Sequence, residues 1–357
     1  MKIAFITEYT EIGGGESNLL NLIEELDKKS INITVFCSGR LKIEVERRNI
    51  KTIHFSTKKR WIGFFPLLPY NNNRIKKQLE EYDIIHAYSV NVLPYLIGIR
   101  PKVIWTAHGF WEKPNGLRSK VIDKIVDRVI CVSTDVYNIC SFELKKKQII
   151  FLGTNLNSKE MQENTNFNSN NVKLTCIGRF QKIKGQDLLV SALQKLAKKY
   201  QNINIELSVI GDVNGNNLRD IEYKKYVLDK VKSYNQKNLT INFLGFRTEI
   251  EFFIKKSNII IIPSRYESFS MVAIEALSCG KPIVGPNTGG LKDIITSEKI
   301  GILFEPDNVN SLEDAIYRAI VNFKEFDSRL AIERADFFSI KNQALKHICL
   351  YKEVLDE

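Results

Sequence analysis

The segment with the most evident chemical capacity is Pro263–Gly280, which reads PSRYESFSMVAIEALSCG. A strand-like run precedes this segment, and a turn leads into a helix predicted from about Phe269 to Ser278. Glu267 stands in the turn before the predicted helix and Glu275 stands on the helix, within reach of the same crevice. The first free N–H groups of that helix, near Ser270 and Met271, favour an anion such as a phosphate. Two carboxylates beside a bound phosphate could accept hydrogen bonds from the hydroxyls of a sugar on one side and a ribose on the other.

Two cations stand at opposite ends of a second short loop, Gly178–Gly185, which follows a predicted strand and reads GRFQKIKG. Arg179 offers a planar fork of donors, whereas Lys184 offers a compact charge. Both side chains could reach one diphosphate. Considered alone, the loop is explained as well by two solvated surface cations, so its meaning depends on the neighbouring motifs.

Glycine-rich turns follow two other predicted strands. Gly13–Gly15 precedes a helix that begins near Glu16, and residues 287–291 (NTGGL) again join a strand to a helix. Glycines there let the backbone approach a ligand closely, although a tight turn without a ligand is the alternative. His108 follows a strand that ends at Thr106 and could act in catalysis, but a buried structural role fits it equally well. The other histidines are interpreted as structural: His54, His86 and His347.

The elements that must position these residues form two series. Short apolar, β-branched runs alternate with amphipathic segments of helical length, which is typical of parallel sheets covered by helices on both faces. The first series of predicted strands is Ile3–Thr7, Ile33–Cys37, Lys51–Phe55, Ile84–Ala87, Val103–Thr106 and Val129–Val132. The second is Leu174–Ile177, Ile205–Ile210, Thr240–Leu244, Ile259–Pro263, Pro282–Val284 and Gly301–Phe304. We therefore expect an α/β protein with two Rossmann-like domains, in which ligands bind beyond the carboxyl ends of the strands.

A polar stretch separates the two series. Asn155–Asn171 is mostly Asn, Ser, Glu and Thr, a composition typical of an exposed linker. We therefore expect a first domain at residues 1–155, a linker at 156–171 and a second domain at 172–339. A final helix is predicted at about residues 340–357.

The composition excludes several classes of protein. The chain has 357 residues, of which 44% are hydrophobic and 26% charged, as is typical of a soluble protein of two domains. No run approaches the roughly 18 consecutive apolar residues of a membrane span, and the chain starts with a strand-like segment rather than a signal peptide. Six scattered cysteines without CxxC spacing are interpreted as buried free thiols in a reducing compartment. We expect a cytoplasmic protein without a metal centre.

The net charge of +11 is unevenly distributed. Between Arg40 and Lys77 there are eleven basic residues, and the only acids are Glu44 and Glu46. Such a patch attracts the phosphates of a nucleic acid, an anionic membrane or a lipid diphosphate, but no motif for nucleic-acid binding accompanies it. The stretch KKRWIGFFPLLPY within it suits a membrane surface or a lipid-linked glycan, and a loop packed on its own domain fits equally well. Acceptor or membrane contacts are predicted at Lys58, Lys59, Arg60 and Trp61.

Taken together, these segments resemble family 4 of the retaining glycosyltransferases (glycosyl transferases group 1), nearly end to end and in the family's order. The matching pieces are Gly13–Gly15, TAHG at 106–109, Gly178-Arg179 with Lys184-Gly185, Glu267 to Glu275 with CGKP at 279–282, and Gly289-Gly290. The closing segment from Phe338 to Tyr351 is similar to the family's last helix, which crosses back onto the N-terminal domain. The resemblance implies the GT-B fold, in which two Rossmann-like domains face one another across a cleft.

The resemblance also implies roles for individual residues. The second domain would hold the nucleotide sugar and the first domain the acceptor. Arg179 and Lys184 would neutralise the departing diphosphate, so neither a metal nor another cofactor is expected. Glu275 would bind the ribose, Glu267 the transferred sugar, and His108 the sugar or its reaction face. The catalytic candidates are therefore Arg179, Lys184, Glu267 and His108. Besides Glu275 and the first three of these, the donor-binding residues implied are Gly14, Gly15, Gly245, Phe246, Phe269, Ser270, Met271, Gly289 and Gly290.

The function that the resemblance implies is the transfer, with retention, of a hexose or N-acetylhexosamine from a nucleotide sugar. UDP is the expected nucleotide of the donor, and the expected acceptor is a lipid-linked glycan in surface polysaccharide biosynthesis, such as O-antigen or capsule. Peripheral contact with the inner face of the cell membrane would accompany that acceptor. No protein nucleophile is assigned, because an oxocarbenium-like state needs a stabilised leaving group more than a strong base, and Glu267 as nucleophile is the alternative. Two other functions stay open, a GT-B sugar-nucleotide epimerase and a non-enzymatic basic binding module.

Three departures from the family's pattern affect details. Leu152 stands where the family usually has Asn, Lys182 where it frequently has Pro, and Ser270 where it frequently has Gly. None of these changes removes a charge that the mechanism needs, but Leu152 and Ser270 would alter the interdomain loop and the sugar pocket.

Overall fold

The computed structural model describes residues 1–57, 61–62, 65–66, 73–109, 112, 117–140, 142, 146–156, 167–213, 215, 217–234 and 236–357. These residues form two compact units. Unit 1 comprises Met1–Asn155 and Phe338–Glu357, and unit 2 comprises Leu156–Phe337. Most of the predicted linker at 156–171 lies outside the described residues, as do Lys58, Lys59 and Arg60.

Unit 1 contains, within its described residues, a seven-stranded parallel sheet with the order β3-β2-β1-β6-β7-β8-β9. Strand β1 lies inside the sheet, and its residues Ile3–Ile6 are fully buried. Such uninterrupted apolar strands are typical of a parallel sheet covered on both faces. The strands are β1 (Lys2–Ile6), β2 (Asn32–Cys37), β3 (Lys51–His54), β6 (Ile84–Ala87), β7 (Lys102–Ala107), β8 (Arg128–Cys131) and β9 (Lys147–Ile149), and a separate antiparallel ribbon pairs β4 (Trp61–Ile62) with β5 (Phe65–Pro66).

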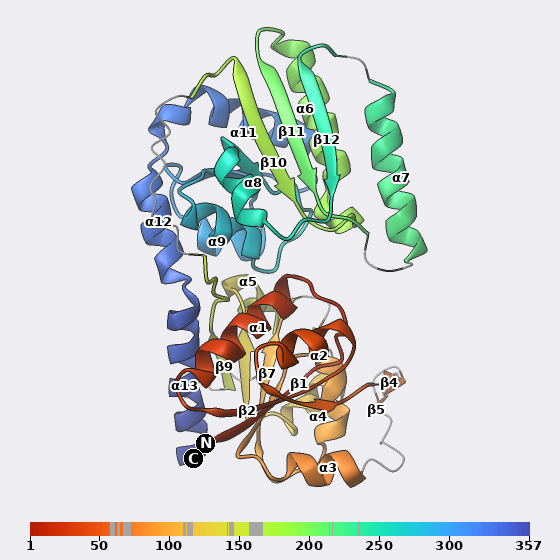
Figure 1. Cartoon of the computed structure of the whole chain (residues 1–357), viewed down its shortest axis with the longest axis vertical. Helices are drawn as coiled ribbons and strands as arrows, with labels where there is room; N and C mark the ends of the chain where they lie inside the picture. Colours follow the sequence, from red (N-terminus) through yellow and green to blue (C-terminus); the bar gives the residue numbers. More distant parts are fainter. Residues whose placement is uncertain are drawn as a thin grey trace. The chain divides into compact units, whose positions relative to one another are not determined.

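The last helix of the chain belongs to the first unit. Leu350 and Val354 of this helix share one apolar core with Leu19 and Leu22 of the first helix. Figure 1 shows the blue α13 beside the red α1. The helices of unit 1 are α1 (Gly14–Asp27), α2 (Gly39–Glu46), α3 (Asn73–Leu79), the 3-10 helix η1 (Val90–Leu96), α4 (Leu117–Asp123), α5 (Thr134–Ile139) and α13 (Ile340–Asp356).

The chain leaves unit 1 and re-enters it at one place. The Thr154 N–H donates to the Phe338 carbonyl at 3.0 Å, and the Ile340 N–H donates to the Thr154 carbonyl at 3.1 Å. Next to this junction, the Gly153 N–H donates to Oε1 of the buried Gln343 at 2.7 Å. Unit 2 is therefore an insertion into unit 1, and its two ends meet at a hydrogen-bonded junction.

Two buried histidines connect α13 to the sheet. The ring nitrogens of His86 are hydrogen-bonded to the Tyr351 hydroxyl and the Thr106 hydroxyl, both at 2.7 Å. His347 stacks on His86 with a centroid distance of 5.6 Å. Burial lowers the pKa of both imidazoles, to about 4 for His347. Both rings are therefore neutral at pH 7 and serve the packing of α13.

Unit 2 contains, in its described part, a six-stranded parallel sheet with the order β12-β11-β10-β13-β14-β15. Its strands are β10 (Asn171–Ile177), β11 (Asn204–Ile210), β12 (Leu239–Gly245), β13 (Ile259–Ile261), β14 (Ile283–Pro286) and β15 (Gly301–Phe304). Its helices are η4 (Lys182–Lys184), α6 (Gln186–Lys199), α7 (Leu218–Lys232), α8 (Ile250–Lys256), α9 (Met271–Ser278), α10 (Leu291–Ile294), α11 (Val309–Val321), η5 (Phe323–Glu325) and α12 (Ser328–Phe337). Helices α6 and α11 bury residues at helical spacing, such as Leu189 and Leu193 or Leu312 and Ile316, and so cover one face of the sheet.

The predicted α/β class with parallel sheets is confirmed. The structure adds β9, whose residues are only half-buried and gave no apolar run in the sequence. Of the six cysteines expected to be buried thiols, Cys349 is exposed on α13 and the other five are buried, all without disulfides. None of the helices that the structure describes is long and apolar enough to cross a bilayer.

Candidate functional site

The sheet of unit 2 brings the basic motif Gly178–Gly185 and the acidic motif Pro263–Gly280 into direct contact. Lys184 lies at the end of η4, after β10, and Glu267 lies in the turn after β13. The Lys184 ammonium donates to Oε2 of Glu267 at 2.7 Å, and the Ser264 hydroxyl donates to the same oxygen at 3.1 Å. The two charged side chains are 26% and 14% exposed. A cation and a carboxylate thus share one partly buried position at the carboxyl ends of the strands, where ligands of open α/β sheets bind.

A third motif, the turn after β14, holds the backbone of Glu267. Gly289 has a φ of +56°, and a Cβ at this position would lie 1.8 Å from the Glu267 carbonyl oxygen. The Gly290 N–H donates to the carbonyls of Glu267 and Ser268 at 3.0 and 3.1 Å. The sequence suggested that this turn supplies backbone donors to a ligand, but the Gly290 N–H serves the fold. Both glycines allow two turns to pack backbone against backbone.

Helix α9 begins four residues after Glu267, and the residue that precedes the helix, Ser270, has a strained backbone. Ser270 has φ 98° and ψ 96°, and its hydroxyl accepts a hydrogen bond from the Ala273 N–H at 3.4 Å. Phe269 is buried, and the helix starts at Met271 rather than at Phe269. The first turn leaves the Ser270 and Met271 N–H groups without acceptors inside the helix, so this end retains the capacity for an anion. Backbone strain in a non-glycine residue is commonly found where function requires a fixed geometry.

Glu275 lies one turn further along α9 in apolar surroundings. Its neighbours Ile274, Ala276 and Leu277 are buried. Burial alone raises the pKa of the Glu275 carboxyl to about 7. The carboxylate therefore gains most from a ligand that supplies hydrogen-bond donors, such as a diol.

Arg179 lies at the carboxyl end of β10, and its side chain is exposed. The buried Gln186 of α6 donates to the Arg179 carbonyl at 2.9 Å, and its own Oε1 is buried without a partner in the described part of the chain. At the ends of the next strands, the Gly211 N–H donates to the Gly245 carbonyl at 2.9 Å. Phe246, which follows Gly245, is 58% exposed. The side chains of Arg179 and Phe246 thus both face solvent at this edge of the sheet.

Sequence reasoning missed a second charged cluster in unit 2. The guanidinium of Arg265 donates to both carboxylate oxygens of Asp187 at 2.9 and 2.8 Å and to Asp307 at 2.8 Å. It also donates to the Lys182 carbonyl at 2.6 Å. Arg265 lies within the motif Pro263–Gly280, and Asp187 lies two residues after the motif Gly178–Gly185. Nothing in the sequence distinguishes either residue from an ordinary surface charge.

In unit 1 the first glycine turn and His108 lie together. Gly13 precedes α1, which begins at Gly14, and a Cβ at Gly15 would lie 3.8 Å from Nδ1 of His108. The ring of His108 packs on Tyr88 with a centroid distance of 4.7 Å, and its Nε2 is buried without a partner among the described residues. Burial lowers the pKa of His108 to about 4. A neutral imidazole with one unsatisfied nitrogen can donate to or accept from a hydroxyl.

Glu112 is a second residue that the sequence analysis missed. It is 3% exposed, and its two carboxyl oxygens accept hydrogen bonds from the His108 N–H at 2.6 Å and the Val90 N–H at 3.3 Å. Burial raises the pKa of Glu112 to about 8. The side chain ties the loop after β7, which carries His108, to the start of η1. Its only signal in the sequence is an acid four residues after His108.

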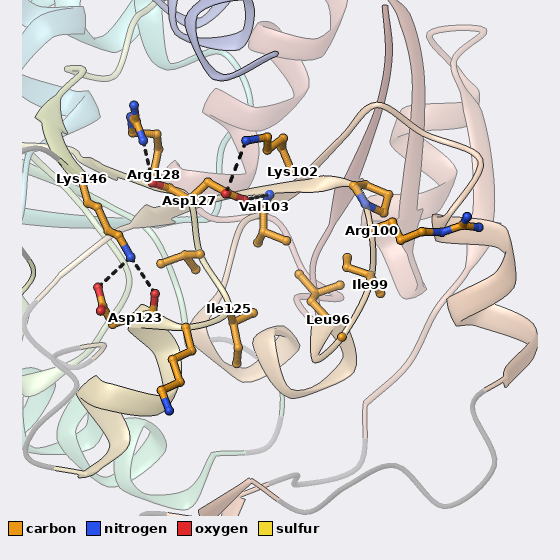
Figure 2. Close-up of a pocket in the computed structure, with 14 residues that line it drawn as sticks. Leu96, Ile99, Arg100, Lys102, Val103, Asp123, Ile125, Asp127, Arg128 and Lys146 are labelled. Atoms are coloured by element: carbon orange, nitrogen blue, oxygen red, sulfur yellow. Dashed lines mark hydrogen bonds and ion pairs between the residues drawn. The ribbon is translucent and has the colours of Figure 1, made fainter. Parts of the chain in front are cut away.

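A cavity of about 690 Å³ lies in unit 1 at the amino ends of β7 and β8. Figure 2 shows Lys146 pointing to Asp123, and Lys102 pointing to Asp127. The Lys146 ammonium donates to the Asp123 carboxylate at 3.1 Å, and Lys102 lies 3.9 Å from Asp127. The cavity is at the opposite ends of the strands from His108, and its acids neutralise part of its basic lining. It is therefore not part of the candidate site.

The predicted acceptor contacts at Lys58, Lys59 and Arg60 lie outside the described residues, and only the backbone of Trp61 is described. Metal-binding groups of three or more His, Cys, Asp or Glu side chains are absent from the residues that the structure describes.

Comparisons with known proteins bear on both units. The model "Glycosyl transferases group 1" matches residues 157–332, and the model "Glycosyltransferase Family 4" matches residues 12–145. The uncharacterized glycosyltransferase MJ1178 of Methanocaldococcus jannaschii is 28% identical over 98% of this chain and 96% of its own length. A D-inositol 3-phosphate glycosyltransferase of Paenarthrobacter aurescens is 28% identical over 50% of this chain and 43% of its own length.

Two solved structures illustrate the similarity of fold. HepE of Anabaena in complex with UDP and glucose has a TM-score of 0.80 and 20% identity, and covers 99% of this chain and 100% of its own. A glycosyltransferase of Rickettsia africae has a TM-score of 0.82 and 21% identity, and covers 99% of this chain and 98% of its own. These likenesses agree with the expected GT-B fold.

Proposed function

Because the chain belongs to glycosyltransferase family 4 (glycosyl transferases group 1), we propose that it transfers a hexose or N-acetylhexosamine from a UDP-sugar to a glycan acceptor, with retention of configuration at the anomeric carbon. The observation that carries this proposal is the contact between Lys184 and Glu267 beside the first turn of α9. This position offers a cation for a diphosphate and a carboxylate for sugar hydroxyls within one hydrogen-bond length of each other. UDP is proposed because the solved HepE structure holds UDP and glucose.

The chemistry follows from where charge develops. The bond between the anomeric carbon and the diphosphate oxygen breaks, and the negative charge on the leaving diphosphate grows. Lys184, Arg179 and the N-terminal amides of α9 stabilise that charge, and stabilisation of this kind is usually the largest single contribution of an enzyme to such a reaction. The acceptor hydroxyl attacks the same face of the sugar, and its proton passes to an oxygen of the departing diphosphate. No metal is needed in this scheme, and Glu267 as a covalent nucleophile is the alternative.

Glu275 and His108 have supporting roles in the proposal. A ribose diol would donate to the Glu275 carboxylate and return the pKa, raised to about 7 by burial, towards its usual value. His108, whose Nε2 has no partner among the described residues and which lies beside Gly15, would contact a hydroxyl of the sugar. The role of His108 uses a polar atom that the described part of the fold leaves unsatisfied.

The acceptor is proposed to be a lipid-linked glycan of a surface polysaccharide. The support is the excess of basic residues between Arg40 and Lys77, which would attract a lipid diphosphate and an anionic membrane surface. The test is to neutralise Lys58, Lys59 and Arg60 together and to measure binding to vesicles that contain 30% anionic lipid. A variant with Lys195, Lys198 and Lys199 of α6 neutralised loses the same number of charges and is the matched control. Equal vesicle binding by both variants would remove the membrane part of the proposal.

The transfer function is tested by release of nucleotide, without acceptor, from UDP-, GDP- and ADP-sugars. Slow release from UDP-sugars is expected, together with its loss in Glu275→Ala. Asp314→Ala, which removes an exposed carboxylate from α11 of the same unit, is the matched control and should release nucleotide at the wild-type rate. Release from GDP- or ADP-sugars alone would replace UDP in the proposal. Conversion of one UDP-sugar into another without release would favour an epimerase, and binding of none of the nucleotides would refute the transferase proposal.

A further inference from the structure

Arg265 joins the two loops that carry Lys184 and Glu267. Its backbone N–H donates to the Ile183 carbonyl at 2.8 Å, and its guanidinium donates to the Lys182 carbonyl at 2.6 Å. Both acceptors immediately precede Lys184 in the chain. Arg265 itself lies two residues before Glu267. Its hydrogen bonds therefore connect the backbone next to Lys184 with the backbone next to Glu267.

The backbones of the two loops also touch directly. Gly185 has a φ of +70°, and a Cβ there would lie 2.0 Å from the Pro263 carbonyl oxygen. Only a glycine lets the two backbones approach this closely, and a shift of one loop away from the other would stretch the bonds of Arg265. The distance between the two site residues therefore depends on how Arg265 is held.

Arg265 is held by Asp187, which is anchored in turn. The carboxylate of Asp187 receives two parallel hydrogen bonds from Arg265, and the Tyr223 hydroxyl of α7 donates to it at 2.6 Å. The Asp187 N–H donates back to the Tyr223 oxygen at 3.1 Å. Although burial favours the protonated form, the bonds from Arg265 and Tyr223 keep the pKa of Asp187 below its usual value. A charged, bidentate pair of this kind fixes orientation as well as distance.

The bonds of Arg265 leave little of it for a ligand. An arginine side chain has five N–H donors. Four of them are used by Asp187, Asp307 and the Lys182 carbonyl, and the side chain is 20% exposed. Arg265 is therefore suited to hold other residues in place rather than to bind a phosphate itself.

We propose that Arg265 and Asp187 form a positioning brace that holds the Lys184 ammonium where it binds the diphosphate and the Glu267 carboxylate where it binds the transferred sugar. The brace rests on the proposed function, because it acts only through Lys184 and Glu267. It makes Arg265 a positioning residue, and its effect on ligand binding should vanish once Lys184 is removed.

The experiment is a double-mutant cycle read out by calorimetric binding of inorganic pyrophosphate, a probe that does not depend on the base. Arg265→Lys keeps the positive charge but loses the fork to Asp187, and it should weaken pyrophosphate binding about tenfold. Lys184→Met should weaken binding about tenfold as well. Because Arg265 acts through Lys184, the double variant should bind no more than about threefold more weakly than Lys184→Met alone. Asp187→Asn carries the same test if Arg265→Lys does not fold.

Arg128→Lys is the matched control, since the guanidinium of Arg128 also donates to a backbone carbonyl, that of Asp127, and to a carboxylate, that of Glu353, but does so within unit 1. It should lower the melting temperature as much as Arg265→Lys does and leave pyrophosphate affinity unchanged. Independent losses that multiply to about 100-fold in the double variant, or wild-type affinity in Arg265→Lys, would overturn the brace. If the wild-type protein bound neither pyrophosphate nor any of the three nucleotides, the proposed function itself would fail.

Discussion

Replacing Glu267 with glutamine isolates the charge of its carboxylate, because the amide keeps the shape and the acceptor oxygen that face Lys184 and Ser264. We expect two changes of opposite direction. The affinity for a nucleoside diphosphate should rise, since the Lys184 cation loses its negative partner and the carboxylate no longer repels the phosphates. Release of nucleotide from a sugar nucleotide should fall at least tenfold, since Glu267 is proposed to bind the transferred sugar.

The structure sets the size of the first change. The Lys184 and Glu267 side chains are 26% and 14% exposed, and their N–O distance is 2.7 Å, so a phosphate held by the same ammonium would lie near the carboxylate. At an effective dielectric constant of about 20 and a separation of about 6 Å, two unit charges repel by about 3 kcal/mol. Exposure to solvent reduces such energies to about 1 kcal/mol. An energy of about 1 kcal/mol corresponds to an affinity about fivefold higher.

The assay is calorimetric titration of UDP into wild-type protein and Glu267→Gln at 50 mM and 500 mM salt. The gain in affinity should shrink at the higher salt, because screening shortens the reach of the lost repulsion. Ser264→Ala, which removes a hydroxyl from the same carboxylate and no charge, is the control and should change UDP affinity less than twofold. Weaker UDP binding by Glu267→Gln would refute the reasoning and would mean that the carboxylate acts mainly by orienting Lys184.

Three further predictions concern stability. Ser270→Gly should leave the unfolding free energy within about 1 kcal/mol of wild type, because relief of the backbone strain offsets the lost helix cap. Ser270→Ala loses the cap without relief of strain, so it should lower the unfolding free energy by about 1 kcal/mol more than Ser270→Gly does. Equal urea midpoints for the two variants would contradict this prediction. The pKa values of His86 and His347 are lowered below the unfolded value of about 6.5, so at these two residues the unfolded state binds more protons, and their contribution to stability falls as pH falls, by about 2 kcal/mol for His347 at pH 5. Because the raised pKa values of Glu112 and Glu275 act in the opposite direction, the check is the change in unfolding free energy between pH 7 and pH 5 in wild type compared with that in His347→Gln, and equal changes would contradict the prediction. Gly289→Ala should lower the melting temperature far more than Gly215→Ala, which shares a positive φ but has open space around it; equal shifts would rule out the close backbone contact.

Much of the fold could be predicted because each buried strand is an apolar run. The strands β10 and β11 are examples, and their predicted ranges fall inside the observed ones. The half-buried β9 gave no such run, since Lys147 and Gln148 are polar; among the described strands it lies at the edge of the sheet, beside β8. Helix α9 starts two residues later than predicted, because the backbone of Ser270, with φ 98° and ψ 96°, is not helical.

The candidate site could be predicted in its residue types but not in its contacts. Lys184 and Glu267 are 83 residues apart, and their contact depends on the order of the strands in the sheet. Arg265 and Asp187 have no periodicity or spacing that distinguishes them from solvated charges. Glu112 is likewise a single acid in a loop, and only the burial of its carboxyl shows that it holds His108.

The hydrogen-bonded junction between Thr154 and Phe338 has a consequence for how the chain is made. The ribosome delivers Met1–Asn155 first, but the helix that completes the core of unit 1 emerges only after all of unit 2. We expect the early segment to remain a loose intermediate with an uncovered apolar groove until α13 arrives, while unit 2 folds on its own local contacts. Since both ends of unit 2 meet at one point, a rearranged gene that joins α13 directly to residue 155 should yield unit 1 as an independent domain.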